Sequence, residues 1–392
     1  MIRIQEAKSW VERTAKSGAT QRVSLQHCTN HYLACDVISS INMPPFRQSA
    51  MDGYALNTQP SNVYTLIGEV KAGDEIQYQL QKGQAVRIFT GAPVPDTANA
   101  VVIQEKVTAN EQLLTIHSEI QVNDNIRGVA EQIKAGDIAL KKGTKITPAG
   151  IGYLASLGIA EVDVFKRPSI AIVTTGNELV EADTPLSHGK IYESNSKMLL
   201  TALQSLDYKE ISLFKVVDNY NKTVQILKEL LSNYDLVLIT GGISVGDYDF
   251  VGRALQELSV KELFYKVNQK PGKPLYFGKK ANTLVFALPG NPAAALSCFY
   301  IYVYPALEIM SGASHFSLLQ TTATSVSEFI KKGDRAQFLK AFFENNQVTI
   351  LEGQSSSMLQ TFALANALVF VEEDKYRIAH GDEVTVLHLP KY

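Results

Sequence analysis

The segment TGGISVGDYDF, residues 240–250, combines residues suited to phosphate binding with acids that would repel phosphate. Gly241 and Gly242 lack side chains, so their backbone N–H groups can approach an anion closely. Asp247 and Asp249 follow in the same segment, and their carboxylates would repel that anion. The conflict disappears if a divalent cation lies between them, because Mg²⁺ binds carboxylate and phosphate oxygens together. The segment is therefore either a polar turn or a phosphate site that includes a metal ion.

Two further acids follow strand-like runs, which favours the metal-containing site. Glu178 comes after SIAIV, in TTGNEL, and Asp218 comes after ISLFKVV. The carboxyl ends of parallel strands meet at one edge of a sheet, so we expect Glu178, Asp218 and Asp249 to lie close together and to hold Mg²⁺. Small and polar residues in the same turns are candidates for substrate binding: Thr175, Gly176, Gly241, Gly242 and Ser244.

The segment QKPGKPLYFG places two lysines, Lys270 and Lys273, on a loop that prolines restrain. Two cations held near each other predict a site for an oxyanion. The loop is not a P-loop, since Pro274 stands where that motif requires serine or threonine. In LPGNPAAAL, Asn291 can cap a helix that Pro292 begins, and a helix N-terminus also favours an anion.

Between residues 168 and 312, nearly continuous apolar runs of β type alternate with helical segments. This alternation predicts a parallel sheet covered by helices on both faces, which is a three-layer, doubly wound α/β domain. Ligands of such domains bind at the carboxyl ends of the strands. TTGNE, TGGIS and LPGNP all fall at these ends, so the candidate residues should form one site.

The rest of the chain divides into three further parts. Residues 41–137 contain short β-type runs separated by Gly, Pro, Asn and Asp, which predicts an inserted all-β lobe. Residues 1–40 and 138–167 flank that lobe and should form one linker unit of helix and strand. Residues 313–392 show short alternating runs and should form a small β barrel.

Composition excludes several classes of partner. A chain of 392 residues, 45% of them hydrophobic, is long enough for several domains. Its net charge of −2 gives no general attraction to nucleic acid or to an anionic membrane. The apolar stretch ALSCFYIYVYPALEIM is interrupted by Ser297 and Pro305 and falls short of the ~20 apolar residues of a membrane span. We therefore expect a buried helix there.

Cysteine usage and the N-terminal segment indicate a cytoplasmic protein. The cysteines at positions 28, 35 and 298 form no CxxC pair, and the first residues lack the apolar block of a signal peptide. The cluster HCTNHYLAC contains zinc-type ligands, but its spacing favours packing around a turn over a zinc site.

Taken together, the motifs of this chain resemble the molybdopterin molybdenumtransferase family, that is, the MoeA and gephyrin E-domain family. The resemblance runs in order through PPFRQSAMDGYAL, FTGAPVPDTANAVV, IRGVAEQIKAGD, VTTGNEL, ESNSKML, TGGISVGDYDFV, KPGKPL and LPGNP. It implies a homodimer with shared active sites that takes adenylated molybdopterin and molybdate, inserts the metal at the dithiolene sulfurs and releases AMP with Mg²⁺. The adenylyltransferase of the same pathway is a further candidate partner.

The resemblance also implies roles for single residues. Glu178, Asp218, Asp249 and Ser244 would belong to the substrate site of the α/β domain, the three acids being catalytic and Mg²⁺ ligands. The site would also be faced by four residues from the β lobe of the other subunit: Asp52, Thr90, Arg127 and Glu131. Of these, Asp52 would be catalytic. The candidates for molybdate binding are Lys270, Lys273, Lys340 and Ser356.

Three departures from the family pattern leave alternatives open. Gln132 stands where the family usually has an aspartate, Lys340 stands where arginine is more usual, and Ser355–Ser357 replaces a glycine-containing turn. An amide at Gln132 removes one expected carboxylate, which motivates a non-catalytic paralogue that only binds or scaffolds molybdopterin. A molybdopterin adenylyltransferase is the other alternative, because a similar α/β domain serves that reaction.

Overall fold

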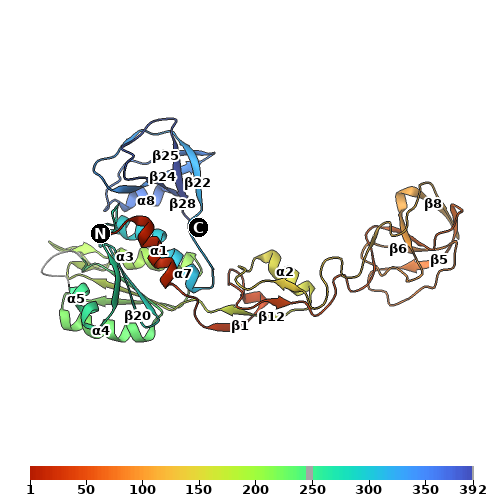
Figure 1. Ribbon diagram of the computed structural model, residues 1–392, viewed down its shortest axis with the longest axis horizontal. Coiled ribbons are helices and arrows are strands. Elements are labelled where there is room, and N and C mark those ends of the chain that lie inside the picture. Colours follow the sequence, from red (N-terminus) through yellow and green to blue (C-terminus); the bar gives the residue numbers. More distant parts are fainter. Residues whose placement is uncertain (244–249, 391–392) are drawn as a thin grey trace. The chain divides into compact units, whose positions relative to one another are not determined.

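The computed structural model describes residues 1–243 and 250–390. The chain forms two compact units (Figure 1). Met1–Gln21 and Val164–Tyr392 make up the first unit, which contains the α/β domain and the C-terminal domain, and Arg22–Asp163 makes up the second.

The α/β domain is built on a six-stranded sheet in the order β16-β13-β17-β21-β20-β18. The first four strands are parallel, as predicted, but β20 and β18 are antiparallel to their neighbours. The reason is the two-residue turn at Ala281 and Asn282, since a connection that short between β20 and β21 permits only an antiparallel pair. The strand bounds are Ile211–Val216 (β16), Ile170–Thr175 (β13), Leu236–Thr240 (β17), Thr283–Leu288 (β21), Tyr276–Lys280 (β20) and Lys261–Tyr265 (β18).

Both faces of this sheet are buried, which confirms the predicted three layers. Ile170 and Ile172 of β13 belong to one hydrophobic cluster, whereas Ala171 and Val173 belong to another. Successive side chains of a strand point to opposite faces, so each cluster covers one face. Helices α4 and α5 lie on one face, and α1, α3 and α7 lie on the other (Figure 1). The helix bounds are Asn195–Ser205 (α3), Tyr220–Asn233 (α4), Phe250–Glu257 (α5), Pro292–Cys298 (α6) and Tyr304–Met310 (α7), with a π-helical turn at Phe299–Val303 between the last two.

Helix α1 (Ile4–Thr14) packs on the α/β domain rather than in the linker unit. Its buried side chains Ile4, Ala7 and Val11 join the hydrophobic cluster that also contains α7. The structure thus departs from the predicted grouping of residues 1–40 with 138–167, because residues 1–21 belong to the first unit. The helical period showed which face of α1 is buried, but it could not show which domain receives that face.

The second unit contains the predicted all-β lobe. Its six-stranded sheet has the order β7-β4-β6-β5-β9-β8, with separate hydrophobic clusters around Val86 and Leu114. In the linker part, helix α2 (Pro148–Ser156) is capped by Thr147, whose hydroxyl accepts a hydrogen bond of 3.1 Å from the Gly150 N–H. The lobe strands are Gly53–Leu56 (β4), Val63–Val70 (β5), Gln84–Ile88 (β6), Ala100–Ile103 (β7), Val107–Asn110 (β8) and Leu113–Ile116 (β9). The two-stranded pairs are β3 (Gln48–Ser49) with β10 (Ile126–Arg127), β2 (Val37–Ile38) with β11 (Ile138–Leu140), and β1 (Thr20–Ser24) with β12 (Glu161–Phe165).

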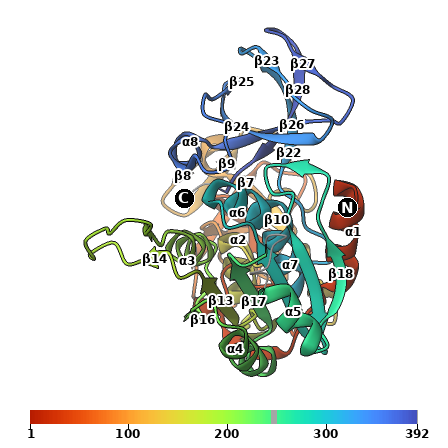
Figure 2. The ribbon, with the colours of Figure 1, turned by 90° about the vertical axis from the view of Figure 1, so that its left-hand side faces the viewer.

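The C-terminal domain is a small closed β barrel, as predicted. Strand β26 pairs with both β28 and β24, which closes the ring β24-β25-β22-β28-β26 (Figure 2). Its interior is filled by side chains such as Leu339, Val369 and Val386. The bounds are Gln320–Ser325 (β22), Ala336–Glu344 (β24), Gln347–Ile350 (β25), Ala367–Val371 (β26), Glu383–His388 (β28) and Leu359–Leu364 (α8). The remaining short pairs are β23 (Phe329–Ile330) with β27 (Arg377–Ile378), and β14 (Leu179–Val180) with β15 (Ile191–Tyr192).

One helical stretch in the described residues, Pro292–Met310, is long and apolar enough to cross a membrane by length and composition alone. It is 19 residues long, and 89% of its most apolar window is buried inside the protein. This burial is the pattern of a core helix, as the sequence predicted for the region around Ser297 and Pro305.

Candidate functional site

A cavity of about 610 Å³ opens at the carboxyl ends of β13, β17 and β21, where ligands of doubly wound domains bind. The C-terminal barrel also contributes to its wall. Eight residues that the sequence singled out line it: Thr175, Glu178, Gly241, Gly242, Lys270, Lys273, Asn291 and Ser356. Three other residues that the sequence singled out, Ser244, Asp247 and Asp249, lie outside the described residues.

The two glycines after β17 are required by their packing against the end of β13. Gly241 has φ +89°, and a Cβ atom there would lie 2.6 Å from the carbonyl oxygen of Thr175. Gly242 has φ +62°, and its Cβ would lie 2.8 Å from the Thr175 hydroxyl oxygen. Any other residue would meet both a strained backbone and a collision, so the close approach of two strand ends depends on these glycines.

Two buried polar atoms in the cavity wall have no partner among the described residues. They are the Thr175 hydroxyl oxygen and the Asn195 carboxamide oxygen. The Asn195 amide group donates hydrogen bonds to the Thr240 hydroxyl (3.0 Å) and to the Gly290 carbonyl (2.9 Å), which fixes the orientation of its free oxygen. Because buried polar groups are nearly always hydrogen-bonded, these two atoms are available to a polar group, of a ligand or of water, in the cavity.

Asn195 was not predicted as a site residue. It stands in ESNSKML at the start of α3, where asparagine is typical of a helix N-terminus and suggests nothing beyond capping. Only the packing of α3 beside the ends of β17 and β21 brings its amide into the cavity.

Buried side chains hold the loop that carries Lys270 and Lys273, which we call the lysine loop. The Tyr302 hydroxyl donates a hydrogen bond of 2.5 Å to the Gln269 carboxamide oxygen, and the Gln269 amide donates to the Gly272 carbonyl at 3.3 Å. Gly272 has φ +86°, and a Cβ atom there would lie 2.4 Å from the Cys298 sulfur. Gln269, Tyr302 and Cys298 are fully buried. Burial raises the pKa of the Cys298 thiol to about 12, so it is a neutral packing group rather than a nucleophile.

A short strand couples the lysine loop to the barrel. Strand β19 (Gln269–Lys270) runs parallel to the start of β24, with Gln269 opposite Ala336. The preceding residue, Arg335, donates a hydrogen bond of 3.1 Å to the Gln269 carbonyl and lines the cavity. Arg335 was not predicted, because nothing in KKGDRAQF relates it to a loop so much earlier in the chain. With Lys270 and Lys273 it forms a group of three cations suited to an oxyanion.

Lys340 takes a different place from the predicted one. It is only 3% exposed and does not line the cavity. Its ammonium donates hydrogen bonds to the carbonyls of Gly353 (2.8 Å), Ser355 (3.1 Å) and Met358 (3.1 Å), which is a structural use of all three of its protons. Lys340 thereby shapes the loop that carries Ser356 into the cavity wall.

Asn291 also differs in detail from its expected role. It precedes α6, which Pro292 begins as predicted, but its side chain makes no capping hydrogen bond. Its amide donates instead to the Ser356 hydroxyl at 2.9 Å, across the boundary between the α/β domain and the barrel. Asn291 and Ser356 therefore line the cavity as a hydrogen-bonded pair.

The two described acids lie on neighbouring strand ends. Glu178 lines the cavity, and its carboxylate lies beside Gly176, where a Cβ atom would come within 2.7 Å of it. Asp218 does not line the cavity; its carboxylate accepts a hydrogen bond of 3.0 Å from the Asn177 N–H. Within residues 1–243 and 250–390 no three His, Cys, Asp or Glu side chains gather as a metal site, and the third predicted ligand, Asp249, falls outside those ranges.

Four predicted site residues belong to the second unit. The Asp52 carboxylate accepts hydrogen bonds of 2.8 Å from both the backbone N–H and the hydroxyl of Thr90. These bonds lower the pKa of Asp52, the backbone bond contributing most, so the carboxylate is ionised at neutral pH. Glu131 accepts a 3.0 Å bond from the Gly128 N–H, and Arg127 is exposed on β10.

Three family models match successive parts of the chain. Residues 2–158 match the MoeA N-terminal region (domains I and II), residues 171–309 match a probable molybdopterin binding domain, and residues 322–389 match the MoeA C-terminal region (domain IV).

Relatives and solved structures match the chain along almost its whole length. Molybdopterin molybdenumtransferase of Haemophilus influenzae is 35% identical, with 98% of each chain covered, and that of Staphylococcus aureus is 33% identical, with 98% of this chain and 95% of the relative covered. The crystal structure of a molybdopterin biosynthesis MoeA protein from Pyrococcus horikoshii superposes with a TM-score of 0.86 at 28% identity, covering 99% of this chain and 100% of that one. The chain therefore belongs to the molybdopterin molybdenumtransferase (MoeA) family.

Proposed function

We propose that this chain is a molybdopterin molybdenumtransferase: it takes adenylated molybdopterin and molybdate, inserts the metal at the dithiolene sulfurs and releases AMP. The observation that carries the proposal is the composition of the cavity at the strand ends. It combines three cations with two buried, unpartnered polar oxygens and one carboxylate. Such a wall suits a ligand that has both oxyanion and hydrogen-bonding groups.

The lysine side of the cavity is the proposed molybdate end. Lys270, Lys273 and Arg335 lie on the β19–β24 side, and Ser356 offers a hydroxyl from the barrel. A tetrahedral dianion needs more than one cation in a partly enclosed site. The metal's soft ligands are the dithiolene sulfurs of the substrate, which is consistent with a lining that contains no cysteine or histidine among the described residues.

The proposed pterin and phosphate side of the cavity consists of Thr175, Asn195 and the turn at Gly241 and Gly242. The Asn195 oxygen can accept a hydrogen bond from a pterin N–H, while the Thr175 hydroxyl can donate to a phosphate oxygen. Both atoms are held in place by the surrounding packing, so binding them requires little reordering of the protein.

The residues also fit Mg²⁺, which we propose as the cofactor. Glu178 presents a carboxylate to the cavity and, among the described residues, is not tied up in an ion pair, while Asp218 lies on the neighbouring strand end. Mg²⁺ usually takes one or two carboxylates from the protein and shares substrate phosphate oxygens. When bound, it would neutralise diphosphate charge beside Glu178, and Asp249 is the proposed further ligand.

The direct test is release of AMP from adenylated molybdopterin by the full chain. We expect AMP release that requires both molybdate and Mg²⁺ and is abolished by chelating the metal ion. The yield of active cofactor, measured by reconstituting a molybdenum enzyme, should rise in parallel. Release that is indifferent to molybdate would overturn the proposal. Tight pterin binding without turnover, restored by Gln132→Asp, would favour the scaffolding alternative, and consumption of ATP with bare molybdopterin would favour the adenylyltransferase.

Removing the hydroxyl that supports the lysine loop should weaken molybdate binding. Tyr302→Phe leaves the buried Gln269 oxygen without its donor, at a cost of about 1–3 kcal/mol, and loosens the loop above it. We expect the KM for molybdate to rise several-fold with a smaller change in kcat. The control is Tyr208→Phe, which removes another buried hydroxyl that contacts Glu308 and Ser311, away from the cavity. Equal KM values in the two variants would show that Tyr302 only stabilises the fold.

The assembly and location of the protein are proposals that the resemblance supports. We propose a cytoplasmic homodimer in which Asp52, Thr90, Arg127 and Glu131 complete the site of the partner subunit, with the pathway's adenylyltransferase as a transient partner. The ionised state of Asp52 and the absence of disulfides among the three cysteines are consistent with these roles. Sedimentation equilibrium should give twice the chain mass of 43.1 kDa, and a monomer at micromolar concentration would exclude the shared site.

A further inference from the structure

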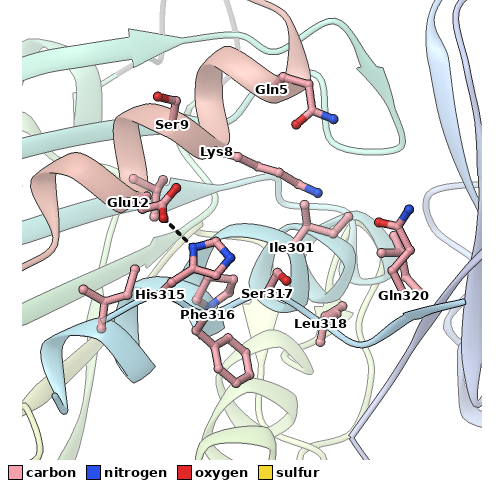
Figure 3. A pocket seen from close by; sticks show the side chains of 14 residues that line it. Gln5, Lys8, Ser9, Glu12, Ile301, His315, Phe316, Ser317, Leu318 and Gln320 are labelled. Carbon is pink, nitrogen blue, oxygen red and sulfur yellow. Dashed lines mark hydrogen bonds and ion pairs between the residues drawn. The ribbon is translucent and has the colours of Figure 1, made fainter. Parts of the chain in front are cut away.

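A second cavity, of about 430 Å³, lies between helix α1 and the segment that connects α7 to β22 (Figure 3). It shares no lining residue with the proposed active site. One part of its wall is apolar and firmly packed: Val11, Ile301, Ile309 and Leu318 are 2%, 4%, 6% and 8% exposed. Polar side chains, among them Lys8, Glu12 and Gln320, line the rest. The volume lies within the range of small-molecule sites.

One cation, the Lys8 ammonium, extends over this apolar part of the wall without a counterion among residues 1–243 and 250–390. Figure 3 shows the Lys8 side chain reaching toward the space between Gln5, Ile301 and Gln320. No carboxylate in the described part of the chain forms an ion pair with it. Burial lowers the pKa of Lys8, which is the behaviour of a desolvated ammonium with no acid beside it.

The absence of a counterion is unexpected for this helix. Glu12 lies four residues after Lys8 and is therefore within reach of it on the helix surface. Glu12 instead contacts the Nδ1 atom of His315, which comes from the segment after α7 (Figure 3). The carboxylate one helical turn after Lys8 is thus engaged at another wall of the cavity, and the Lys8 charge remains available to a ligand.

We propose that this cavity binds a small organic acid, a carboxylate attached to an apolar body. The apolar body would cover Val11, Ile301 and Leu318, and the carboxylate would pair with Lys8. The amide groups of Gln5 and Gln320 at the cavity wall can supply further hydrogen bonds to its oxygens. A single ammonium balances a single negative charge, whereas a dianion such as molybdate would leave one charge uncompensated beside the buried apolar side chains.

Calorimetric titration of the full chain with phenylacetate and with octanoate tests this site. At least one of the two acids should bind, and the neutral analogue phenylacetamide should not. Lys8→Met keeps the apolar stem but removes the charge, so it should weaken binding at least about tenfold. Lys228→Met, which removes an exposed charge on α4, and Lys273→Met, which alters the other cavity, should both leave binding unchanged.

Two further measurements make the outcome decisive. Ser317→Trp should block the cavity by bulk while keeping Lys8, and it should also abolish binding. The thermal unfolding midpoint of Lys8→Met should not fall, because a partly buried, unpaired charge is lost. Equal affinity of the acids for the parent chain and for Lys8→Met would overturn the proposal. So would a dissociation constant above about 10 mM for both acids, which is too weak to indicate a built site.

Discussion

Replacing Lys270 and Lys273 together by methionine should lower molybdate-dependent AMP release by roughly a hundredfold to ten-thousandfold. A hydrogen bond to a charged partner contributes about 1.5–3 kcal/mol, and each factor of ten in rate corresponds to about 1.4 kcal/mol. Both lysines line the cavity and sit on a loop that Gln269 and Gly272 anchor from below. Removing both therefore leaves Arg335 as the sole cation among the described residues at the proposed molybdate end. The measurement is initial rate against molybdate concentration.

The matched control removes the same charge elsewhere in the domain. Lys222 and Lys228 are exposed on α4, so Lys222→Met/Lys228→Met changes the net charge equally without touching the cavity. It should keep the parent rate. Two outcomes would refute the placement of the oxyanion at Lys270 and Lys273. The first is an unchanged rate in the Lys270→Met/Lys273→Met variant. The second is a lower rate that arises only from weaker pterin binding, measured with molybdate at saturation.

Gly241→Ala should abolish turnover and destabilise the first unit by about 2–4 kcal/mol. The alanine would adopt φ +89°, and its Cβ would lie 2.6 Å from the Thr175 carbonyl oxygen, a backbone atom that cannot move without displacing β13. Because Thr175 and the glycine turn both line the cavity, relief of the collision also deforms the site. Scanning calorimetry should report a lower unfolding midpoint, and the AMP assay should report the lost activity.

Gly189→Ala separates the two causes of that destabilisation. Gly189 has φ +80°, but a Cβ atom added there would meet no other atom within 4 Å, so the substitution adds only the backbone cost of about 1–2 kcal/mol. The difference between the two variants measures the collision at Gly241. Equal shifts in the unfolding midpoint would contradict a close contact between the ends of β13 and β17.

Local patterns predicted the layers of the α/β domain because strand and helix periods report burial directly. The alternation of Ile170 and Ile172 with Ala171 and Val173 places residues on two faces, and no long-range information is needed to see it. The same reasoning could not anticipate the antiparallel β20, since a two-residue connection at Ala281 is a property of the backbone turn rather than of hydrophobic pattern.

The sequence could predict which residues line the cavity where strand order sufficed, but not where the α/β domain and the barrel meet. Thr175, Glu178 and Gly241 follow strands, so their convergence at one edge follows from a parallel sheet. Arg335 enters the cavity only because β19 pairs with β24, and Asn195 enters it only because α3 packs beside β17. Conversely, Lys340 lies only a few residues after Arg335, which lines the cavity, yet its ammonium donates hydrogen bonds to three backbone carbonyls.

By itself, then, the order of residues determined the layered α/β domain, the β lobe, the barrel, the family and the strand ends that form the cavity. Tertiary structure alone decided which domain holds α1 and which cations line the cavity together. It also decided that Lys340 supports a loop, while Lys8 has no ion-pair partner in the described part of the chain. The physical reason is the sequence separation over which each kind of interaction acts. Periodicity and turn chemistry act over a few neighbouring residues, whereas a charge finds its partner or remains without one only after segments hundreds of positions apart have packed together.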